Sequence, residues 1–187
     1  VFIHNSVSLR ALIPLLFYRK KWIVVHHMIL ANKTLKQKVI SYLKRFVLKF
    51  ADNVAVSQFM ADYYGNNSKV IPNPIDLNIA KIDLLNKDRD FVFMGRLIRE
   101  KGAHLALEAL KGLDGSRTLT IIGTGPEEGN LKILCKKLNL CSRVIFTGRL
   151  NGDDLYNEIK RHKVLLAPSI WTEPFGVVVL EGYACGC

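Results

Sequence analysis

Two glutamates near the end of the chain flank a turn whose chemistry suits a ligand with a phosphate and several hydroxyls. Glu173 precedes Pro174-Phe175-Gly176, and Glu181 lies within a predicted helix over residues 177–184. The amino end of a helix offers N–H groups and partial positive charge to a phosphate, and carboxylates accept hydrogen bonds from hydroxyls. We expect Pro174 in the first helical turn and Gly176 where a ligand approaches the backbone. The alternative is a capped helix with two solvated glutamates.

Glycine-containing turns follow four predicted strands in the second half of the chain. The strands cover residues 91–94, 119–122, 144–146 and 164–166, and the turns contain Gly95, Gly123 with Gly125, Gly148, and Gly176. Helices alternate with these strands, which predicts a parallel sheet with all four turns at one edge. The apolar run of residues 164–167 predicts a buried strand.

Cationic side chains strengthen the first of these turns as an anion site. Each turn can present backbone N–H groups to an anion. Arg96 can contact two oxygens at once and Lys101 acts as a point charge. Together with the two glutamates, this phosphate-binding rim indicates a nucleotide sugar as the ligand.

The first half of the chain predicts a second strand and helix series. Strands are expected over residues 1–3, 22–25, 53–56 and 69–71, and helices over residues 8–18, 34–50 and, after an N-cap at Ser57, up to residue 64. His26 and His27 end the second of these strands, at the edge where open sheets bind ligands. His104 and His162 lie in helical contexts and are expected to be surface or packing residues. A polar stretch ending at residue 90 predicts a connection between domains.

Positive charge is concentrated near the amino end. The net charge is +11, and the first fifty residues hold ten Lys and Arg and no Asp or Glu. Such a face implies an anionic partner (lipid headgroups, nucleic acid or a phosphorylated substrate) or a solvated basic surface. In residues 34–50 one helical stripe is formed by Leu35, Val39, Leu43, Phe46, Val47 and Phe50. We expect that stripe in the core, because a strand follows at once, with an acidic membrane surface as the alternative.

Several classes of site are absent from the sequence. The four cysteines have no metal-ligand spacing and predict reduced thiols. The Gly123 turn fails the dinucleotide fingerprint because Glu128 occupies the third glycine position. There is no P-loop, no nucleophile elbow and no apolar run of the ~20 residues that span a bilayer.

The motifs named above resemble glycosyltransferase family 4 in order and spacing. The matching segments are Gly95-Arg96-Leu97 with Glu100-Lys101-Gly102, Ile122-Gly123-Thr124-Gly125-Pro126, Val144-Ile145-Phe146-Thr147-Gly148, and Pro168-Ser169 through Glu173-Pro174-Phe175-Gly176 to Glu181. Residues 71–76 resemble that family's interdomain linker. The resemblance implies an α/β chain of GT-B type with two Rossmann-like parallel-sheet domains, both incomplete. Residues 1–76 would be part of the acceptor-side domain, 77–90 the linker, and 91–187 a truncated donor-binding domain. We therefore expect a fragment of a longer enzyme that is inactive alone.

The resemblance also implies a role for each matching residue. Arg96 and Lys101 would neutralise the donor pyrophosphate, Glu173 would bind the donor sugar, and His27 would lie near the reacting sugar. Glu181 would accept hydrogen bonds from the ribose. The further donor-binding positions are Gly95, Gly123, Gly125, Gly148, Arg149, Leu150, Phe175, Gly176 and Val177. Neither a metal nor another cofactor is expected.

The expected activity is sugar transfer, with retention of configuration, from a nucleoside-diphosphate sugar to a glycan or lipid-linked acceptor. One alternative is a GT-B nucleotide-sugar epimerase. Another is a basic nucleic-acid-binding module, which needs aromatic stacking platforms. The aromatic residues among the cations (Phe17, Tyr18, Trp22 and Tyr42) lie in contexts too apolar for that role. We expect a cytoplasmic protein, without a nucleic-acid partner, whose basic amino-terminal part can contact an acidic membrane.

Overall fold

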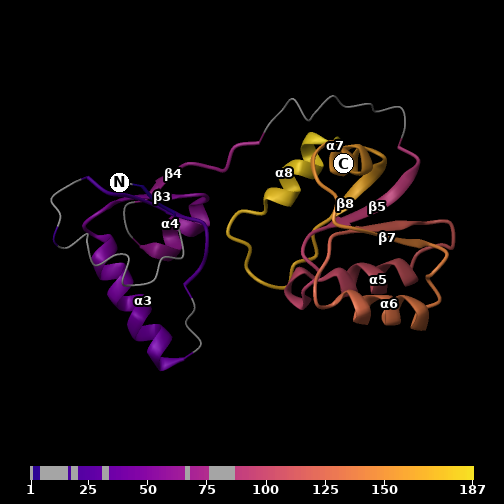
Figure 1. The fold of residues 1–187 in the computed structure, drawn as a ribbon, viewed down its shortest axis with the longest axis horizontal. Coiled ribbons are helices and arrows are strands. Elements are labelled where there is room, and N and C mark those ends of the chain that lie inside the picture. The colour runs from indigo at the N-terminus through magenta and orange to yellow at the C-terminus, as the bar shows by residue number, and fades with distance from the viewer. Residues whose placement is uncertain (1, 5–16, 18–20, 31–33, 66–67, 76–86) are drawn as a thin grey trace. The chain divides into compact units, whose positions relative to one another are not determined.

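The computed structural model describes residues 2–4, 17, 21–30, 34–65, 68–75 and 87–187. The chain forms two compact units, Val1–Pro74 and Ile75–Cys187, each built on a parallel sheet (Figure 1). This confirms the α/β class. The predicted helix over residues 8–18 lies outside the described residues except for Phe17. The predicted connection over residues 77–90 extends too far, because Arg89 and Asp90 already belong to a strand.

In the first unit, four parallel strands pair in chain order. They are β1 (Phe2–His4), β2 (Ile23–His26), β3 (Asp52–Ala55) and β4 (Lys69–Val70). Two helices are α3 (Leu35–Leu48) and α4 (Gln58–Tyr64). Thr34 and Gln37 form a capping box at α3, and the Ser57 side chain accepts a hydrogen bond from the Met60 N–H at 3.2 Å. The predicted N-cap at Ser57 is thus confirmed.

The apolar stripe of α3 faces solvent. Only Ser41, Val47 and Leu48 of this helix are buried. Of the predicted stripe residues only Val47 is buried, whereas Leu35, Val39, Leu43 and Phe46, with Phe50 beyond the helix end, are between 41% and 79% exposed. The favoured prediction that the stripe faces the core is therefore wrong except at Val47. The unit packs against the side of the helix that carries Ser41 and Leu48, which the hydrophobic pattern did not single out.

In the second unit, strands and helices alternate. The strands are β5 (Arg89–Met94), β6 (Leu119–Ile122), β7 (Val144–Gly148) and β8 (His162–Leu166). The helices are α5 (Ala103–Lys111), α6 (Glu128–Lys137), α7 (Gly152–Lys160) and α8 (Val177–Ala184). The sheet order is β7-β6-β5-β8 with every pairing parallel. All four strands therefore end at the same edge.

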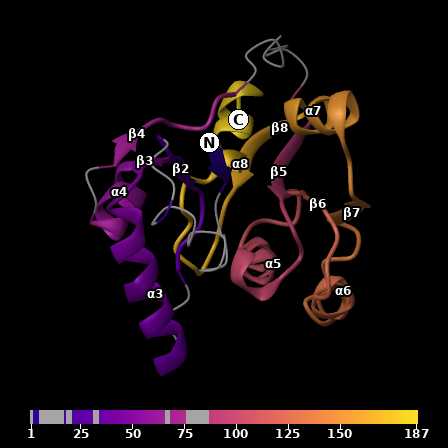
Figure 2. The same ribbon diagram turned by 60° about the vertical axis from the view of Figure 1, so that its left-hand side comes forward.

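Helices cover both faces of this sheet. Figure 2 shows α5 and α6 on one side and α7 and α8 on the other. Successive side chains of a strand point to opposite faces. Accordingly, Phe93 packs in the cluster of α5 and α6, whereas its neighbour Val92 packs with Ile159 and Cys185 on the other face. The result is a three-layer arrangement with a separate core on each side.

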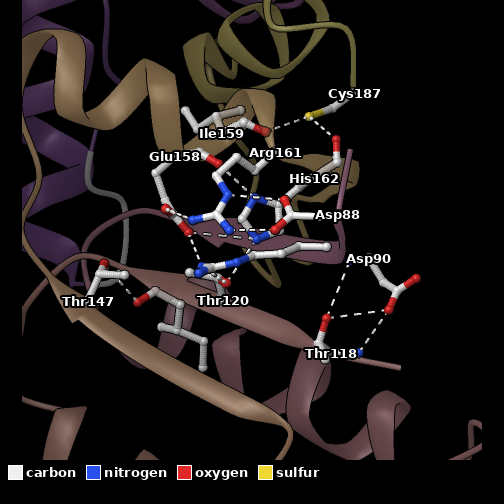
Figure 3. Close-up of polar contacts among 12 residues, drawn as sticks. Asp88, Asp90, Thr118, Thr120, Thr147, Glu158, Ile159, Arg161, His162 and Cys187 are labelled. Atoms are coloured by element: carbon white, nitrogen blue, oxygen red, sulfur yellow. Dashed lines mark hydrogen bonds and ion pairs between the residues drawn. The ribbon is translucent and has the colours of Figure 1, made fainter. Parts of the chain in front are cut away.

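A polar network at His162 fastens α7 to the sheet (Figure 3). His162 is fully buried, with Nδ1 at 2.8 Å from the Glu158 carbonyl and Nε2 at 2.8 Å from the Thr120 hydroxyl. Burial lowers the pKa of His162, so the ring is neutral. A carbonyl oxygen can only accept, so Nδ1 carries the proton and Nε2 accepts from Thr120. Glu158 of α7 also forms an ion pair with Arg89, the first residue of β5.

Two expectations about β8 need correction. Residues 164–167 were expected to form a buried strand, but Val164 is 44% exposed. The reason is that β8 pairs only with β5 among the described strands and so lies at the edge of the sheet. His162 was expected in a helix, whereas it begins β8.

Asp90 provides a pH-dependent test of the start of β5. Burial alone would raise its pKa, but hydrogen bonds from the Thr118 N–H, Arg117 and Lys163 outweigh burial and lower the pKa to about 2. The ionised carboxylate thus stabilises the fold by about 2 kcal/mol at neutral pH. This contribution is complete above about pH 4 and is lost as the pH falls toward 2.

We predict that Asp90→Asn lowers the free energy of unfolding by about 2 kcal/mol at pH 7 and by much less near pH 2. Urea denaturation of both proteins at several pH values measures the difference. Asp153→Asn, at an exposed position in the first turn of α7, serves as control. A loss at Asp90 that does not change with pH would contradict the prediction.

Candidate functional site

A pocket of about 500 Å³ opens at the edge of the second unit's sheet where β5, β6 and β7 end. Its wall also includes one residue of α7, Leu155. The lining residues are Met94, Gly95, Arg96, Ile122, Gly123, Thr124, Gly125, Pro126, Arg149, Leu150 and Leu155. The pocket therefore brings together six predicted site residues: Gly95, Arg96, Gly123, Gly125, Arg149 and Leu150.

Close backbone packing explains the glycines of the β6 turn. A Cβ on Gly123 would lie 1.9 Å from the Gly95 carbonyl oxygen, and one on Gly125 would lie 2.3 Å from that of Leu97. The Gly95 N–H donates to the Ile122 carbonyl at 3.0 Å, and the Gly123 N–H donates to the Gly148 carbonyl at 2.8 Å. These two N–H groups are thus engaged within the protein, and any backbone N–H offered to an anion comes from other residues of the turns. These glycines let neighbouring turns run side by side.

Two arginines give the pocket its positive charge. Arg96 follows β5 and Arg149 follows β7, on either side of the β6 turn. Both are exposed at the pocket, and Arg149 Nε donates to Asn151 Oδ1 at 3.2 Å. Among the described residues, Arg96 has no ion-pair partner. Its guanidinium is available to an anion that enters the pocket.

A second group of predicted residues meets where β5 and β8 end. Lys101 and Glu173 form an ion pair across 72 positions of the sequence. The two loops are fastened together, because the Ile170 N–H donates to the Glu100 carbonyl at 2.9 Å. A Cβ on Gly102 would lie 2.0 Å from the Pro168 carbonyl oxygen. Gly102, which has φ +74°, thus permits the contact that places Lys101 beside Glu173.

Glu173 is held as a carboxylate by three neighbours. Burial alone would raise its pKa, but hydrogen bonds from Lys101, Ser169 and Trp171 outweigh burial and lower it. The Ser169 hydroxyl lies 2.8 Å from Oε1, and the Lys101 ammonium lies 5.5 Å from the centre of the Trp171 ring. Ser169 and Trp171 were not singled out by the sequence analysis. Their position in the Pro-Ser-containing loop before Glu173 was the available signal.

Glu181 occupies a less polar environment. It is half-buried in α8, and burial raises its pKa, while a hydrogen bond from Tyr156 of α7 partly offsets this effect. Tyr156 follows Leu155 of the pocket wall, so α7 links Glu181 to the pocket. Nothing in the sequence pattern had distinguished Tyr156.

The start of α8 differs from expectation at Pro174. Pro174 is buried in the preceding loop and does not form the first helical turn. The helix begins at Val177, and Gly176 is its N-cap residue with φ 78°. A left-handed conformation suits glycine best, which accounts for Gly176 here. Phe175 lies between Pro174 and Gly176 in the loop that leads into the helix.

His27 belongs to the first unit, directly after β2. Its neighbour His26 is buried, with Nε2 at 2.9 Å from Asn53 Oδ1 and its ring stacked on Tyr64 at 3.9 Å. Burial lowers the pKa of His26. His26 is therefore a packing residue. His27 is only half-buried, and its role near the reacting sugar stays a prediction.

The described residues contain no group of three or more His, Cys, Asp or Glu side chains placed to hold a metal ion. All four cysteines are free thiols. Within the same residues, no helix is both long and apolar enough to cross a membrane.

Comparison with solved structures identifies the fold as GT-B. One match is a structure of Anabaena Alr3699/HepE in complex with UDP, at 23% identity and a TM-score of 0.85, covering 99% of this chain and 57% of that one. A complex of the same protein with UDP-glucose gives a TM-score of 0.75 at 23% identity, with the same coverage.

The chain belongs to the glycosyl transferases group 1 family, whose model matches residues 75–187. It is 29% identical over 169 residues to an uncharacterized glycosyltransferase of Methanocaldococcus jannaschii, covering 84% of this chain and 40% of that protein. It is 28% identical over 158 residues to the O-antigen chain mannosyltransferase C of Escherichia coli, covering 79% and 41% respectively. The chain thus spans about half the length, or less, of the relatives it matches.

The close contact at Gly123 provides a test of the pocket's architecture. We predict that Gly123→Ala destabilises the protein by about 3 kcal/mol or more, because the new methyl meets backbone at a φ of +133°. Thermal unfolding followed by circular dichroism measures the loss. The control is Gly129→Ala in α6, where nothing lies within 4 Å of the added Cβ and a helical alanine is favoured. Equal stability of the two variants would contradict the proposed packing.

Proposed function

We propose that this chain forms the donor-binding part of a retaining glycosyltransferase that moves a sugar from a nucleoside-diphosphate sugar to a glycan or lipid-linked acceptor. The observation that carries the proposal is the pocket bordered by Arg96 and Arg149, at the same sheet edge as the Lys101–Glu173 pair. The relative with UDP and UDP-glucose bound supports a nucleotide-sugar donor. The O-antigen mannosyltransferase supports a glycan acceptor.

In this proposal, cations of the chain hold the diphosphate. Arg96 has planar paired donors that match two phosphate oxygens, and Lys101 adds a point charge. As the bond between the sugar and the diphosphate breaks, negative charge grows on the leaving oxygen. Positive side chains fixed in advance stabilise that charge more in the transition state than in the bound donor, which lowers the barrier. Neither a metal nor another cofactor is required by the proposal.

The remaining site residues recognise the other parts of the donor. Gly148, Arg149 and Leu150 flank the base, and Glu181 accepts hydrogen bonds from the ribose. The loop of Phe175, Gly176 and Val177 approaches the sugar and phosphate. Glu173 accepts hydrogen bonds from the sugar hydroxyls, and its low pKa keeps it ionised for this purpose.

The Lys101–Glu173 pair has a specific consequence for binding. Both side chains are about one-quarter exposed, so water only partly screens the attraction between the two charges. Lys101 must share its charge between Glu173 and an arriving phosphate. Ser169 and Trp171 hold Glu173 while this happens, so the carboxylate stays in place for the sugar.

The first prediction from this proposal concerns the diphosphate. Arg96→Ala is expected to weaken the binding of nucleoside diphosphates (UDP, GDP or ADP) by about 10- to 100-fold, through loss of a charge-assisted bidentate contact. Titration calorimetry on the chain measures the affinity. The matched control is Arg99→Ala, an exposed arginine in the 3₁₀ turn Arg99–Lys101, which should change the affinity less than twofold. Equal effects of both variants would refute the assignment of Arg96.

The second prediction separates the sugar from the diphosphate. Glu173→Gln frees Lys101 for phosphate, so the free diphosphate should bind as well as before or several-fold tighter. The extra affinity of the nucleotide sugar over the diphosphate should be lost. Glu108→Gln, on the exposed side of α5, is the control. Parallel weakening of both ligands by Glu173→Gln would contradict the division of roles.

Turnover gives a third prediction. In acceptor-dependent transfer by the full-length enzyme, Glu173→Ala and Arg96→Ala should each lower the rate by about 100-fold or more, because each removes an interaction with the reacting donor. Mass analysis of the products identifies transfer. Unchanged rates in both variants would refute the proposal, and isomerised free nucleotide sugar without acceptor would identify an epimerase.

A further inference from the structure

The exposed stripe of α3 is continuous and aromatic-rich. At about 100° per residue, its six side chains (Leu35, Val39, Tyr42, Leu43, Phe46 and Phe50) occupy an arc of about 100°. The buried side chains Ser41 and Leu48 lie on the opposite side of the helix, and buried Val47 lies next to the margin of the stripe beside Leu43. The rings of Phe46 and Phe50 meet edge to face at 5.7 Å, so the stripe continues past the helix end. The helix is therefore anchored in its unit while its most apolar face remains accessible.

Cations border this stripe on both sides. Exposed Lys36 lies along one margin, and exposed Lys38 and Lys49 lie along the other. Residues 34–50 contain five Lys and Arg and no Asp or Glu. The face thus combines an apolar centre with positive margins and no acidic residue to repel an anion.

We propose that α3 is an interfacial helix that binds the first unit to an anionic lipid surface. The apolar stripe enters the boundary between headgroups and acyl chains, and the lysines along its margins remain at the level of the lipid phosphates. Tyr42 and Phe46 suit this boundary, because aromatic side chains are enriched there. This inference does not depend on the proposed sugar transfer.

The distribution of charge favours lipid over other anionic partners. A nucleic acid needs cations along its phosphate track and aromatic rings spaced among them. Here the cations lie at the margins, and the aromatic rings are grouped with aliphatic side chains in the stripe and are not spaced among the cations. A layered partner with charge outside and hydrocarbon inside matches both features at once.

Vesicle binding by the 187-residue chain tests the proposal. The chain should cosediment with phosphatidylcholine vesicles that contain about 30% phosphatidylglycerol at least about 10-fold more strongly than with phosphatidylcholine alone. Raising the salt to about 0.5 M should weaken the binding, since screening shortens the reach of surface charge. Equal binding to both vesicles, or none to either, would overturn the proposal.

Matched variants assign the binding to α3. Phe46→Ser should reduce vesicle binding by about 10-fold or more. The control Ile133→Ser changes an apolar side chain of α6 that is 67% exposed and should have little effect. Lys36→Glu with Lys49→Glu should abolish the preference for anionic vesicles, whereas the same charge change at exposed Lys136 and Lys137 of α6 should not.

Further outcomes exclude the other occupants of this face. Far-ultraviolet circular dichroism confirms that each variant keeps its helices. If α3 and α6 variants lose binding equally, overall charge is responsible and the proposal fails. It also fails if Phe46→Ser dissociates a dimer in light scattering while vesicles do not bind, because the face then joins two copies. Single-stranded DNA that binds wild type and Phe46→Ser equally and displaces vesicles would likewise overturn it.

Discussion

The parallel pairing of β5 with β6 on one side and β8 on the other is the constraint on which the site depends. It forces three loops that are distant in sequence to leave the sheet at one edge. The loops lie so close that a side chain on Gly102 or Gly123 would enter neighbouring backbone. From this proximity follows the ion pair of Lys101 with Glu173. The parallel pairing of β7 with β6 adds the loop that brings Arg149 into the same pocket as Arg96. The glycines serve the packing of the loops first, and the charged groups are positioned as its consequence.

A second layer of interactions supports the site from behind. The neutral ring of His162 joins β8 to Thr120 of β6 and to the carbonyl of Glu158 in α7. A neutral imidazole with a donor on one nitrogen and an acceptor on the other satisfies both contacts without burying a charge. The same helix contributes Leu155 to the pocket and Tyr156 to Glu181. The contacts of buried His162 therefore help to orient α7, and α7 in turn positions Glu181, the residue proposed to bind the ribose.

Sequence periodicity predicted the strands and helices of the second unit well, because alternation of strand and helix with glycine turns leaves few arrangements of a parallel sheet. Periodicity failed to predict burial where the local pattern does not reveal which other helix or strand packs against the element. The predicted stripe of α3 has the spacing of a core face, yet of its residues only Val47 is buried, and Ser41 and Leu48 outside the stripe are buried instead. The apolar run of β8 suggested burial on both faces, yet the strand lies at the sheet edge. Contacts such as Trp171 and Tyr156 with the two glutamates depend on side-chain direction across separate elements, which spacing alone does not encode.

The two basic features of this chain differ in how their charge can be used. In the pocket, few cations act, and each is aimed by the end of a strand or by a hydrogen-bonded loop. Geometry of this kind favours an anion of fixed shape, since the charges cannot follow a different ligand. On α3, the cations stand on long flexible side chains around apolar surface, so they can adapt to many arrangements of phosphate but gain little from any single one. A net charge of +11 would suggest one general affinity for anions. In the two proposals, the pocket discriminates among small ligands, whereas the affinity of the α3 surface depends on the density of charge it meets.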